Sequence, residues 1–224
     1  MASLFVVGTP IGNLEDLTFR AKRILSSVSI IACEDTRVTK KLLEHYAITT
    51  PTTSIHHHTP AAKLDDLLRR IEQGNDVAVV TDAGMPGVSD PGGKLVSRAW
   101  ERGLKVESVP GPSALTTAAS LSGVPTDQFL FLGFLPHKKG RETLFRRIAD
   151  TEETVVLYES PHRLLKTLDS LLRLSLNKEI VVCRELTKIY ESVVRGSAEH
   201  VFKHFTEHPD EVRGEVVIII GPQS

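Results

Sequence analysis

Residues 77–93 read VAVVTDAGMPGVSDPGG, a short apolar run followed by a long turn-forming segment. The run at 77–81 is almost wholly apolar, which is typical of a parallel strand that is buried on both faces. The segment 82–93 contains four glycines and two prolines, which form tight turns and let the backbone approach a ligand closely. Ligands of open parallel sheets bind beyond the carboxyl ends of the strands. We therefore expect this stretch to supply one strand of a parallel sheet and one loop of a binding site.

The first half of the chain repeats this arrangement of strand and turn. Helical patterns separate further apolar runs, which predicts a parallel sheet covered by helices on both faces. Asn13 is placed to cap the first of these helices. Besides 77–81, we predict strands at 4–7, 28–33, 52–55 and 105–109. Four of the five strands are followed by distinctive loops, at 8–13 (GTPIGN), 34–37 (EDTR), 82–93 and 110–114 (PGPSA). Four such loops at one edge of one sheet predict a ligand site.

The pattern pauses at residues 121–127, LSGVPTD, where glycine, proline and aspartate cluster. Such a cluster predicts a domain boundary. We expect an N-terminal α/β domain at 1–122 and a C-terminal α/β domain at 123–224. In the second domain we predict strands at 129–132, 155–158, 180–183 and 215–220, and helices around 141–148, 161–174 and 198–205.

The composition is that of an ordinary globular protein. The 224 residues include 27 Lys and Arg against 28 Asp and Glu, with 41% hydrophobic residues, which argues against indiscriminate coating of nucleic acid. Cys33 and Cys183 lie in apolar runs and form no Cys-x-x-Cys pair, so we expect two buried thiols in a reducing compartment. No apolar stretch is long enough to cross a bilayer, and the N-terminus lacks the charged region of a signal peptide. We therefore expect a cytoplasmic protein.

The charges of the four loops bear on the kind of ligand. The dinucleotide pattern G-x-G-x-x-G is missing from residues 8–12. Residues 87–95 depart from a P-loop, because Lys94 stands one position late and Leu95 replaces the Ser or Thr that would hold Mg²⁺. The long loop at 82–93 carries Asp82 and Asp90, with Lys94 directly after it as its one cation. This balance disfavours a polyphosphate and suits a neutral or cationic ligand such as S-adenosylmethionine, with its sulfonium and ammonium groups.

Two other chemistries are not supported. The run His56-His57-His58 does not predict a metal site, since consecutive strand side chains point in opposite directions and no partner stands at a zinc-motif spacing. Ser113 follows Pro112 and is not part of a G-x-S-x-G elbow, so a serine nucleophile is not indicated. We expect no metal.

A basic run follows the first predicted strand of the second domain. Residues 136–147 carry five Lys or Arg and one Glu, a local charge of +4. Such a run is often only a solvated helix face. Since the rest of the chain has more acidic than basic residues, we expect this patch to bind phosphates.

Several segments, in order along the whole chain, resemble the tetrapyrrole-methylase superfamily and its ribosomal RNA branch. In the first half they are 6–14 (VVGTPIGNL), 33–37 (CEDTR), 81–86 (TDAGMP), 89–92 (SDPG) and 109–114 (VPGPSA). In the second half they are 133–136 (GFLP), 158–163 (YESPHR), 184–188 (RELTK) and 213–215 (RGE). The first loop and the tripeptide Gly84-Met85-Pro86 differ from G-x-G-x-G-D and Gly-Asp-Pro of the tetrapyrrole-modifying relatives, which points to the RNA branch.

The resemblance implies two α/β domains of the tetrapyrrole-methylase type with S-adenosylmethionine in the interdomain cleft. It implies a homodimer that methylates a cytidine ribose of 16S ribosomal RNA, either free or within the small ribosomal subunit. The residues that it implies for the cofactor are Pro10, Ile11, Asp82, Met85, Val88, Ser113, Ala114, Tyr158, Gly214 and Glu215. For RNA binding we expect Lys138, Lys139, Arg141, Arg163 and Arg184.

The chemistry of the transfer suggests catalytic residues. Methyl transfer to a hydroxyl is an in-line displacement in which alignment supplies much of the rate, and a carboxylate that accepts the proton helps. The candidates are Glu34 and Asp35, with Arg37 placed to hold them or a phosphate. The same residues also suit a helix cap, because acidic side chains favour a helix N-terminus. Alternatives from the second domain are Glu159, His162, Arg184 and Glu185.

Two other functions remain open at this point. A small-molecule methylase would bind a porphyrinoid in the same site. A non-catalytic module would bind S-adenosylmethionine without turnover.

Overall fold

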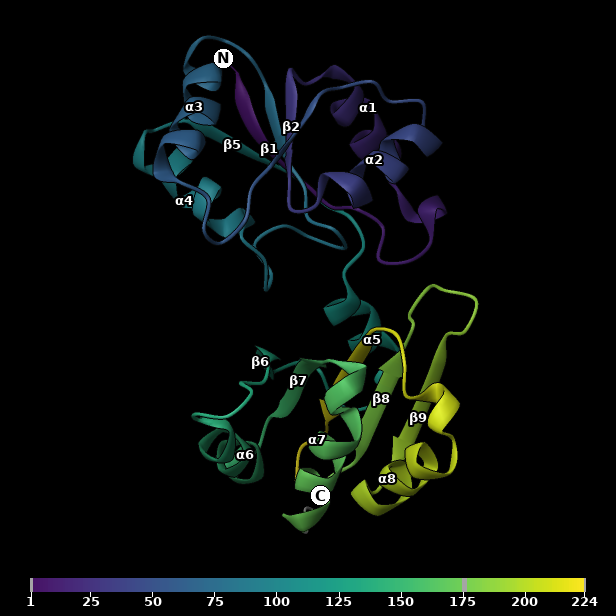
Figure 1. Cartoon of the computed structure of the whole chain (residues 1–224). Coiled ribbons are helices and arrows are strands. Elements are labelled where there is room, and N and C mark those ends of the chain that lie inside the picture. Colours follow the sequence, from purple (N-terminus) through teal and green to yellow (C-terminus); the bar gives the residue numbers. More distant parts are fainter. Residues whose placement is uncertain (1, 175–176, 224) are drawn as a thin grey trace. The chain divides into compact units, whose positions relative to one another are not determined.

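The computed structural model describes residues 2–174 and 177–223. The chain forms two compact units, Met1–Ser113 and Ala114–Ser224, and each contains a five-stranded sheet. Both units are α/β (Figure 1), as predicted. Within the described residues, no helix is long and apolar enough to cross a membrane.

The first unit is a parallel sheet with helices on both faces. Its strand order is β3-β2-β4-β1-β5, and every pairing is parallel. The strands are β1 (Ser3–Val7), β2 (Ile30–Cys33), β3 (Thr52–Ser54), β4 (Val77–Val79) and β5 (Lys105–Val109). The helices are α1 (Phe19–Ser27), α2 (Thr36–His45), α3 (Ala61–Glu72) and α4 (Gly92–Glu101). Figure 1 shows α1 and α2 on one side of the sheet and α3 and α4 on the other. Because the strands are parallel, their exit loops lie at one edge.

The helix start predicted at Asn13 is wrong for α1. Asn13 Oδ1 accepts a hydrogen bond from Glu15 N at 3.1 Å and caps only the 3₁₀ turn η1 (Leu14–Asp16). Leu17 and Thr18 are extended, and Thr18 Oγ1 accepts from Ala21 N at 3.0 Å to cap α1. Two capping side chains in succession divide the apolar pattern into a turn and a helix.

The second unit has a mixed sheet of order β6-β7-β10-β8-β9. β6 and β7 are parallel, whereas β10 is antiparallel to β7 and β8, and β8 to β9. The strands are β6 (Phe129–Phe134), β7 (Thr154–Glu159), β8 (Ile180–Arg184), β9 (Ser192–Gly196) and β10 (Val216–Ile220). The helices are α5 (Ala114–Ser122), α6 (Arg141–Asp150), α7 (Pro161–Arg173), α8 (Ala198–Glu207) and the 3₁₀ turn η2 (Pro209–Glu211).

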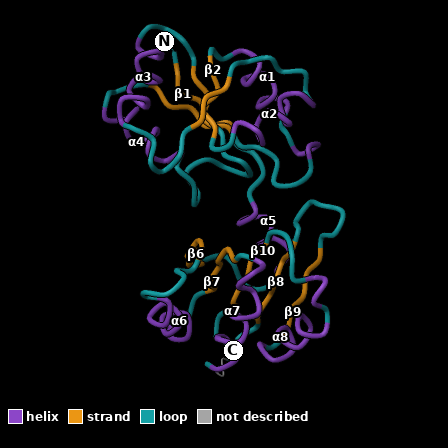
Figure 2. Tube along the Cα trace, in the orientation of Figure 1, coloured by secondary structure: helices purple, strands orange, loops and turns teal. Residues whose placement is uncertain are grey.

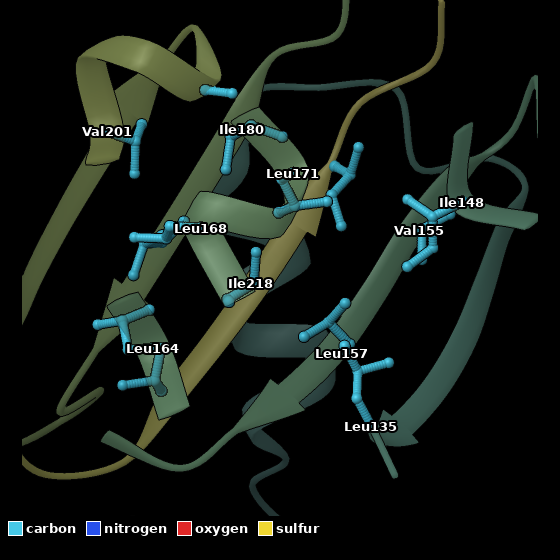
Figure 3. Packing of buried hydrophobic residues seen from close by; sticks show 14 of the residues in the cluster. Leu135, Ile148, Val155, Leu157, Leu164, Leu168, Leu171, Ile180, Val201 and Ile218 are labelled. Carbon is cyan, nitrogen blue, oxygen red and sulfur yellow. The ribbon is translucent and has the colours of Figure 1, made fainter. Parts of the chain in front are cut away.

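The core of the second unit lies between its sheet and α6, α7 and α8. Leu164, Leu168 and Leu171 recur at helical spacing on α7 and are fully buried. They pack with Leu157 of β7 and Ile218 of β10 (Figure 3). The continuous apolar run of β10 is buried on both faces, which is why it forms the centre of the sheet.

Helix α5 belongs to the second unit and not to the first. It packs on β8, β9 and β10, and Figure 2 shows it beside that sheet. The division therefore lies between Ser113 and Ala114 rather than at the expected 122/123. The turn residues Gly123 and Pro125 end a helix of the second unit, since Gly123 has φ +69° after the last residue of α5.

Candidate functional site

Two loops and the end of β5 meet in hydrogen bonds at the carboxyl edge of the first sheet. Gly8 N, after β1, donates to Val109 O of β5 at 3.0 Å. Thr9 and Gly84 exchange two backbone hydrogen bonds, of 3.0 and 3.1 Å, which join the loop after β1 to the loop after β4. Thr9 Oγ1 also donates to Thr81 O at 3.1 Å. The loops predicted from their glycines and prolines are therefore one connected structure.

Glycine is required where these loops touch. A Cβ atom on Gly8 would lie 2.7 Å from Gly111 Cα and 2.7 Å from Met85 Sδ. A Cβ atom on Gly111 would in turn lie 3.0 Å from the Gly8 backbone. Backbone atoms cannot move aside as a flexible side chain can, so the two main chains approach only because both residues lack a side chain.

The same contacts bring together cofactor candidates from three loops. Gly84 has φ +90°, and a Cβ there would lie 3.5 Å from Ile11 Cγ2 and 4.0 Å from Ser113 Cα. Met85 lies against Gly8, as described above. Ile11 and Ser113 therefore lie beside Gly84, and Met85 lies beside Gly8, so the three loops that carry these candidates are in contact.

Asp90 organises the long loop after β4. Its carboxylate accepts from Gly87 N at 2.8 Å, Gly92 N at 2.7 Å and Val88 N at 3.2 Å. From the sequence, the negative charge of Asp90 was expected to attract a cationic ligand. In the structure this carboxylate accepts hydrogen bonds from backbone amides of its own loop. Its effect is to fix the turn that leaves Val88 exposed at the tip of the loop.

Glu34 and Asp82 tie the loop after β2 to the loop after β4. Thr81 Oγ1 donates to Glu34 Oε2 at 3.2 Å, and Asp35 N donates to Asp82 Oδ1 at 2.9 Å. Burial raises the pKa of Glu34, and the neighbouring Asp82 raises it further. Burial also raises the pKa of Asp82 above its ordinary value. Two carboxyl groups with raised pKa values attract a cation and accept protons better than ordinary carboxylates.

Asp35 has the geometry of a helix cap, the alternative that the sequence left open. Its Oδ1 accepts from Arg37 N at 2.8 Å at the start of α2, and Arg37 Nη2 donates to Oδ2 at 2.7 Å. These hydrogen bonds with Arg37 lower the pKa of Asp35 to about 2. A carboxylate of such low pKa is a poor proton acceptor, so among the three catalytic candidates Glu34 is better suited to that role.

The histidine run lies in an exposed turn before α3. His56 N donates to Thr59 Oγ1 at 2.7 Å, and His57 O accepts from Lys94 Nζ at 2.6 Å. Lys94, the cation directly after the long loop, is therefore engaged with a backbone carbonyl. Over the ranges 2–174 and 177–223, no group of three His, Cys, Asp or Glu side chains is arranged to hold a metal.

In the second unit, a buried carboxylate lies at the end of β7. Glu159 is fully buried and accepts from Arg163 Nη2 at 2.6 Å and from Thr167 Oγ1 at 2.5 Å. Arg141 Nη1 lies 3.8 Å from Glu159 Oε2, and Arg141 Nη2 donates to Thr167 Oγ1 at 2.7 Å. The charge of Glu159 is thus balanced by two guanidinium groups.

Three arginines expected to bind RNA are not surface residues, and this prediction is corrected for them. Arg141 is 7% exposed and Arg184 is 5% exposed, and the side chain of Arg163 is 15% exposed. Arg184 Nε donates to Ser192 Oγ at 3.1 Å across the β8–β9 pair. A buried guanidinium that pairs with a carboxylate or holds a neighbouring strand does not extend to a phosphate in solution.

Two of these arginines fix the backbone that precedes the basic segment. Arg163 Nη1 donates to Leu135 O at 2.6 Å, and Arg141 Nη1 donates to Pro136 O at 3.4 Å. Lys138 and Lys139 follow directly and are exposed. In the part of the chain that the structure describes, neither lysine forms an ion pair. These two lysines keep the position expected of phosphate-binding residues.

The remaining candidates of the second unit form two groups. Tyr158 packs edge-on against Phe131, with ring centroids 5.0 Å apart. Glu185 Oε1 accepts from Glu215 N at 2.9 Å and from Lys188 Nζ at 2.7 Å, so this carboxylate is engaged in a local ion pair. Gly214 has φ +81°, and a Cβ there would overlap the Glu185 carboxyl group.

Sequence reasoning missed two features of these sites. The contact between Gly8 and Gly111 joins residues about a hundred positions apart, and only the pairing of β1 with β5 reveals it. The sequence offers Glu159 as an alternative base, whereas its neighbours show a structural ion-pair centre. The spacing of Glu159 and Arg163, four residues apart where β7 leads into α7, was the available signal.

The chain is similar to known proteins over most of its length. A family model described as tetrapyrrole (corrin/porphyrin) methylases matches residues 3–201. The ribosomal RNA small subunit methyltransferase I of Thermotoga maritima is 41% identical over 221 residues, which are 99% of this chain and 99% of that protein. The protein of the same name from Halalkalibacterium halodurans is 45% identical over 219 residues, 97% of this chain and 75% of that protein.

Solved structures share the fold. A diphthine synthase superposes with a TM-score of 0.75 at 13% identity, over 99% of this chain and 90% of that chain. A cobalt precorrin-4 methyltransferase superposes with a TM-score of 0.70 at 17% identity, over 98% of this chain and 94% of that chain. At these identities the likeness concerns the fold alone.

Proposed function

Because the chain belongs to the tetrapyrrole methylase family and, within it, to the ribosomal RNA small subunit methyltransferases I, we propose that it transfers a methyl group from S-adenosylmethionine to the 2′-hydroxyl of a cytidine ribose in 16S ribosomal RNA. The chain is a methyltransferase of small-subunit ribosomal RNA, and the observation that carries this is the 41% identity over 99% of both chains. The donor, the 2′-hydroxyl and the cytidine are the parts that we propose.

The loops of the first unit fit the donor. Bound S-adenosylmethionine supplies an electrophilic methyl group on a sulfonium sulfur and leaves as a neutral thioether. The close backbone contact of Gly8 with Gly111 holds the loops after β1 and β5 in a fixed position against which the donor can bind. The carboxyl groups of Glu34 and Asp82 complement the positive charges of the donor. From this unit we propose Pro10, Ile11, Asp82, Met85, Val88 and Ser113 as donor-binding residues. Ala114, Tyr158, Gly214 and Glu215 of the second unit stay predictions of the same kind.

The chain's own residues would act on the hydroxyl proton. As the ribose oxygen bonds to the methyl carbon and the carbon–sulfur bond breaks, the proton must leave the oxygen. We assign its acceptance to the Glu34 carboxylate, since burial and Asp82 raise the pKa of Glu34 while Arg37 lowers that of Asp35. Asp35 and Arg37 position α2 and the loop before it. Lys138 and Lys139 would neutralise RNA phosphates.

Two further proposals rest on the family likeness. The first is that the protein acts as a homodimer, and the second is that it works in the cytoplasm, where its RNA substrate is made. Sedimentation of the purified protein tests the first, and fractionation of cells tests the second.

The function is tested by transfer of labelled methyl from S-adenosylmethionine to 16S RNA, offered free and within the small subunit. The substrates come from cells lacking the gene, and primer extension at low nucleotide concentration locates the ribose methyl group. We expect one new stop at a cytidine. Label on a base, or an unchanged pattern with both substrates, would reject the assignment.

Variants in the same assay test the role of Glu34. Glu34→Gln should lower kcat strongly while the affinity for S-adenosylhomocysteine changes little. Glu15→Gln, at an exposed position of the η1 turn, is the matched control and should behave as the wild type.

A further inference from the structure

Strand β6 contains an irregularity that changes where its last side chain points. Phe131 is paired with Val156 of β7, but Phe134 is paired with Tyr158. Three residues of β6 therefore span two residues of β7, and Gly133 within this bulge has φ +59°. A bulge adds one residue and reverses the alternation of side chains beyond it.

The bulge takes Phe134 away from the hydrophobic core. Leu130 and Leu132 pack against the core of the second unit, and strict alternation would direct Phe134 to their side. With the extra residue, Phe134 comes to the face that carries Phe131 and Tyr158. Its ring lies 5.5 Å from the Tyr158 ring, and Tyr158 in turn lies 5.0 Å from Phe131.

Phe134 is open to solvent although it belongs to this aromatic group. It is 56% exposed, whereas Phe131 and Tyr158 behind it are half-buried. An exposed ring supported by two others offers a flat, rigid apolar surface. Bulges that redirect a side chain are common next to functional sites. The solvent exposure of Phe134 is therefore typical of a side chain that binds a ligand.

Positive charge follows the ring within a few residues. Lys138 and Lys139 are exposed. Hydrogen bonds from Arg163 to Leu135 O and from Arg141 to Pro136 O fix the backbone just before these two lysines. An aromatic surface followed by exposed cations matches a nucleotide, whose base is flat and whose phosphate is anionic. A cationic methyl donor matches this charge less well than RNA does.

We propose that Phe134 is a stacking site for a base of the RNA substrate, with the phosphates of the same strand on Lys138 and Lys139. The inference rests on the proposed function and extends it to how a single-stranded nucleotide is held. Stacking is tolerant of base identity, so the site would bind the strand beside the target ribose without selecting its sequence.

The test uses the full chain and a single-stranded fragment of 16S RNA. Phe134→Leu should weaken RNA binding about tenfold, within the ~1–3 kcal/mol of one base–aromatic stack, and Phe134→Tyr should restore it. Phe129→Leu is the matched control, since Phe129 is on the same strand and 38% exposed, and it should bind as the wild type. The affinity for S-adenosylhomocysteine should be unchanged in all three variants.

A fluorescent variant distinguishes an RNA base from the adenine of the donor. Trp100→Phe removes the single tryptophan of the chain. When Phe134→Trp is added to this variant, the RNA fragment should quench the tryptophan fluorescence and S-adenosylhomocysteine should not. Quenching by S-adenosylhomocysteine alone would assign the ring to the donor and overturn the proposal. Equal RNA affinity of Phe134→Leu and the wild type, in a protein that still methylates RNA, would overturn the stacking site alone. A wild type that neither binds nor methylates RNA would overturn the proposed function as well.

Discussion

Arg163 and Glu159 form a salt bridge of 2.6 Å in which the carboxylate is fully buried and the guanidinium side chain is 15% exposed. The same guanidinium donates to Leu135 O at 2.6 Å. The pair therefore connects the end of β7 and the first turn of α7 to the segment that carries the exposed lysines. A buried ion pair adds little net stability, but losing one partner leaves an uncompensated charge.

Removing the charge of Glu159 should destabilise the protein. Glu159→Gln leaves Arg163 and Arg141 without their shared carboxylate, so we expect the free energy of unfolding to fall by about 3–5 kcal/mol. Urea denaturation measures this. Asp169→Asn is the control, because its Arg173 partner is largely exposed and such pairs contribute about 0–1 kcal/mol. Equal effects of the two substitutions would show that the Glu159 cluster is not a buried charge centre.

A methyl group at Gly8 should damage the donor site. In Gly8→Ala the new Cβ would meet Gly111 Cα at 2.7 Å, so the loops after β1 and β5 must separate. We expect a loss of about 1–3 kcal/mol of stability and a tenfold or greater loss of S-adenosylmethionine affinity by calorimetry. Gly93→Ala, whose Cβ has its nearest neighbour at 3.9 Å, should keep both. Unchanged affinity in Gly8→Ala would separate the loop contact from donor binding.

The raised pKa of Glu34 predicts a pH effect of definite sign. Over the interval from the ordinary value of 4.5 up to the raised value, the folded protein keeps a proton that the unfolded chain has released. The contribution of Glu34 to stability therefore falls as pH rises through this interval. Asp82→Asn removes the neighbouring charge, so the pKa of Glu34 should decrease and the fall should become smaller.

Carbon-detected NMR titration of the Glu34 carboxyl group measures this directly. Asn at position 82 keeps an oxygen that accepts from Asp35 N, so the hydrogen bond of 2.9 Å can persist. Asp66→Asn, at an exposed site on α3, serves as the control and should leave the pKa of Glu34 unchanged. A Glu34 midpoint that does not move in Asp82→Asn would remove the coupling between the two carboxyl groups.

The exposed lysines should set the salt dependence of RNA binding. Lys138→Ala combined with Lys139→Ala removes two phosphate contacts, and the slope of log affinity against log salt should become shallower by about 1.4 for a single strand. Filter binding over a range of salt concentrations gives the slope. Lys40→Ala combined with Lys203→Ala removes two exposed lysines elsewhere and should leave it unchanged. A slope that is the same in both double variants would take residues 138 and 139 out of the interface.

The fold was predictable because its signals are local. The apolar runs of β1, β4 and β5 and the glycines and prolines after them lie within single segments, so strands, loops and their common edge followed from the sequence. The domain boundary was less predictable than the strands. The turn residues around Gly123 only end α5, and the packing of α5 on β8, β9 and β10 places the division before this helix, between Ser113 and Ala114.

Side-chain roles were predictable only in part. Asp35 could cap a helix or act as a base, and the hydrogen bonds of Arg37 show the cap. Arg141 and Arg163 count as surface cations in a sequence, but Glu159 pairs with both from another element. A net charge of +4 over a segment does not reveal which of its cations already have a partner.

The sequence by itself determined the alternation of strands and helices, the chemistry of the exit loops and the family, because each is written in short contiguous patterns. Only the tertiary structure decided that Gly8 must touch Gly111, that Glu159 draws two arginines inside, and that a bulge directs Phe134 to solvent. These features depend on strand pairing and on burial between residues far apart in the chain, and neither can be derived from the character of a residue and its immediate neighbours.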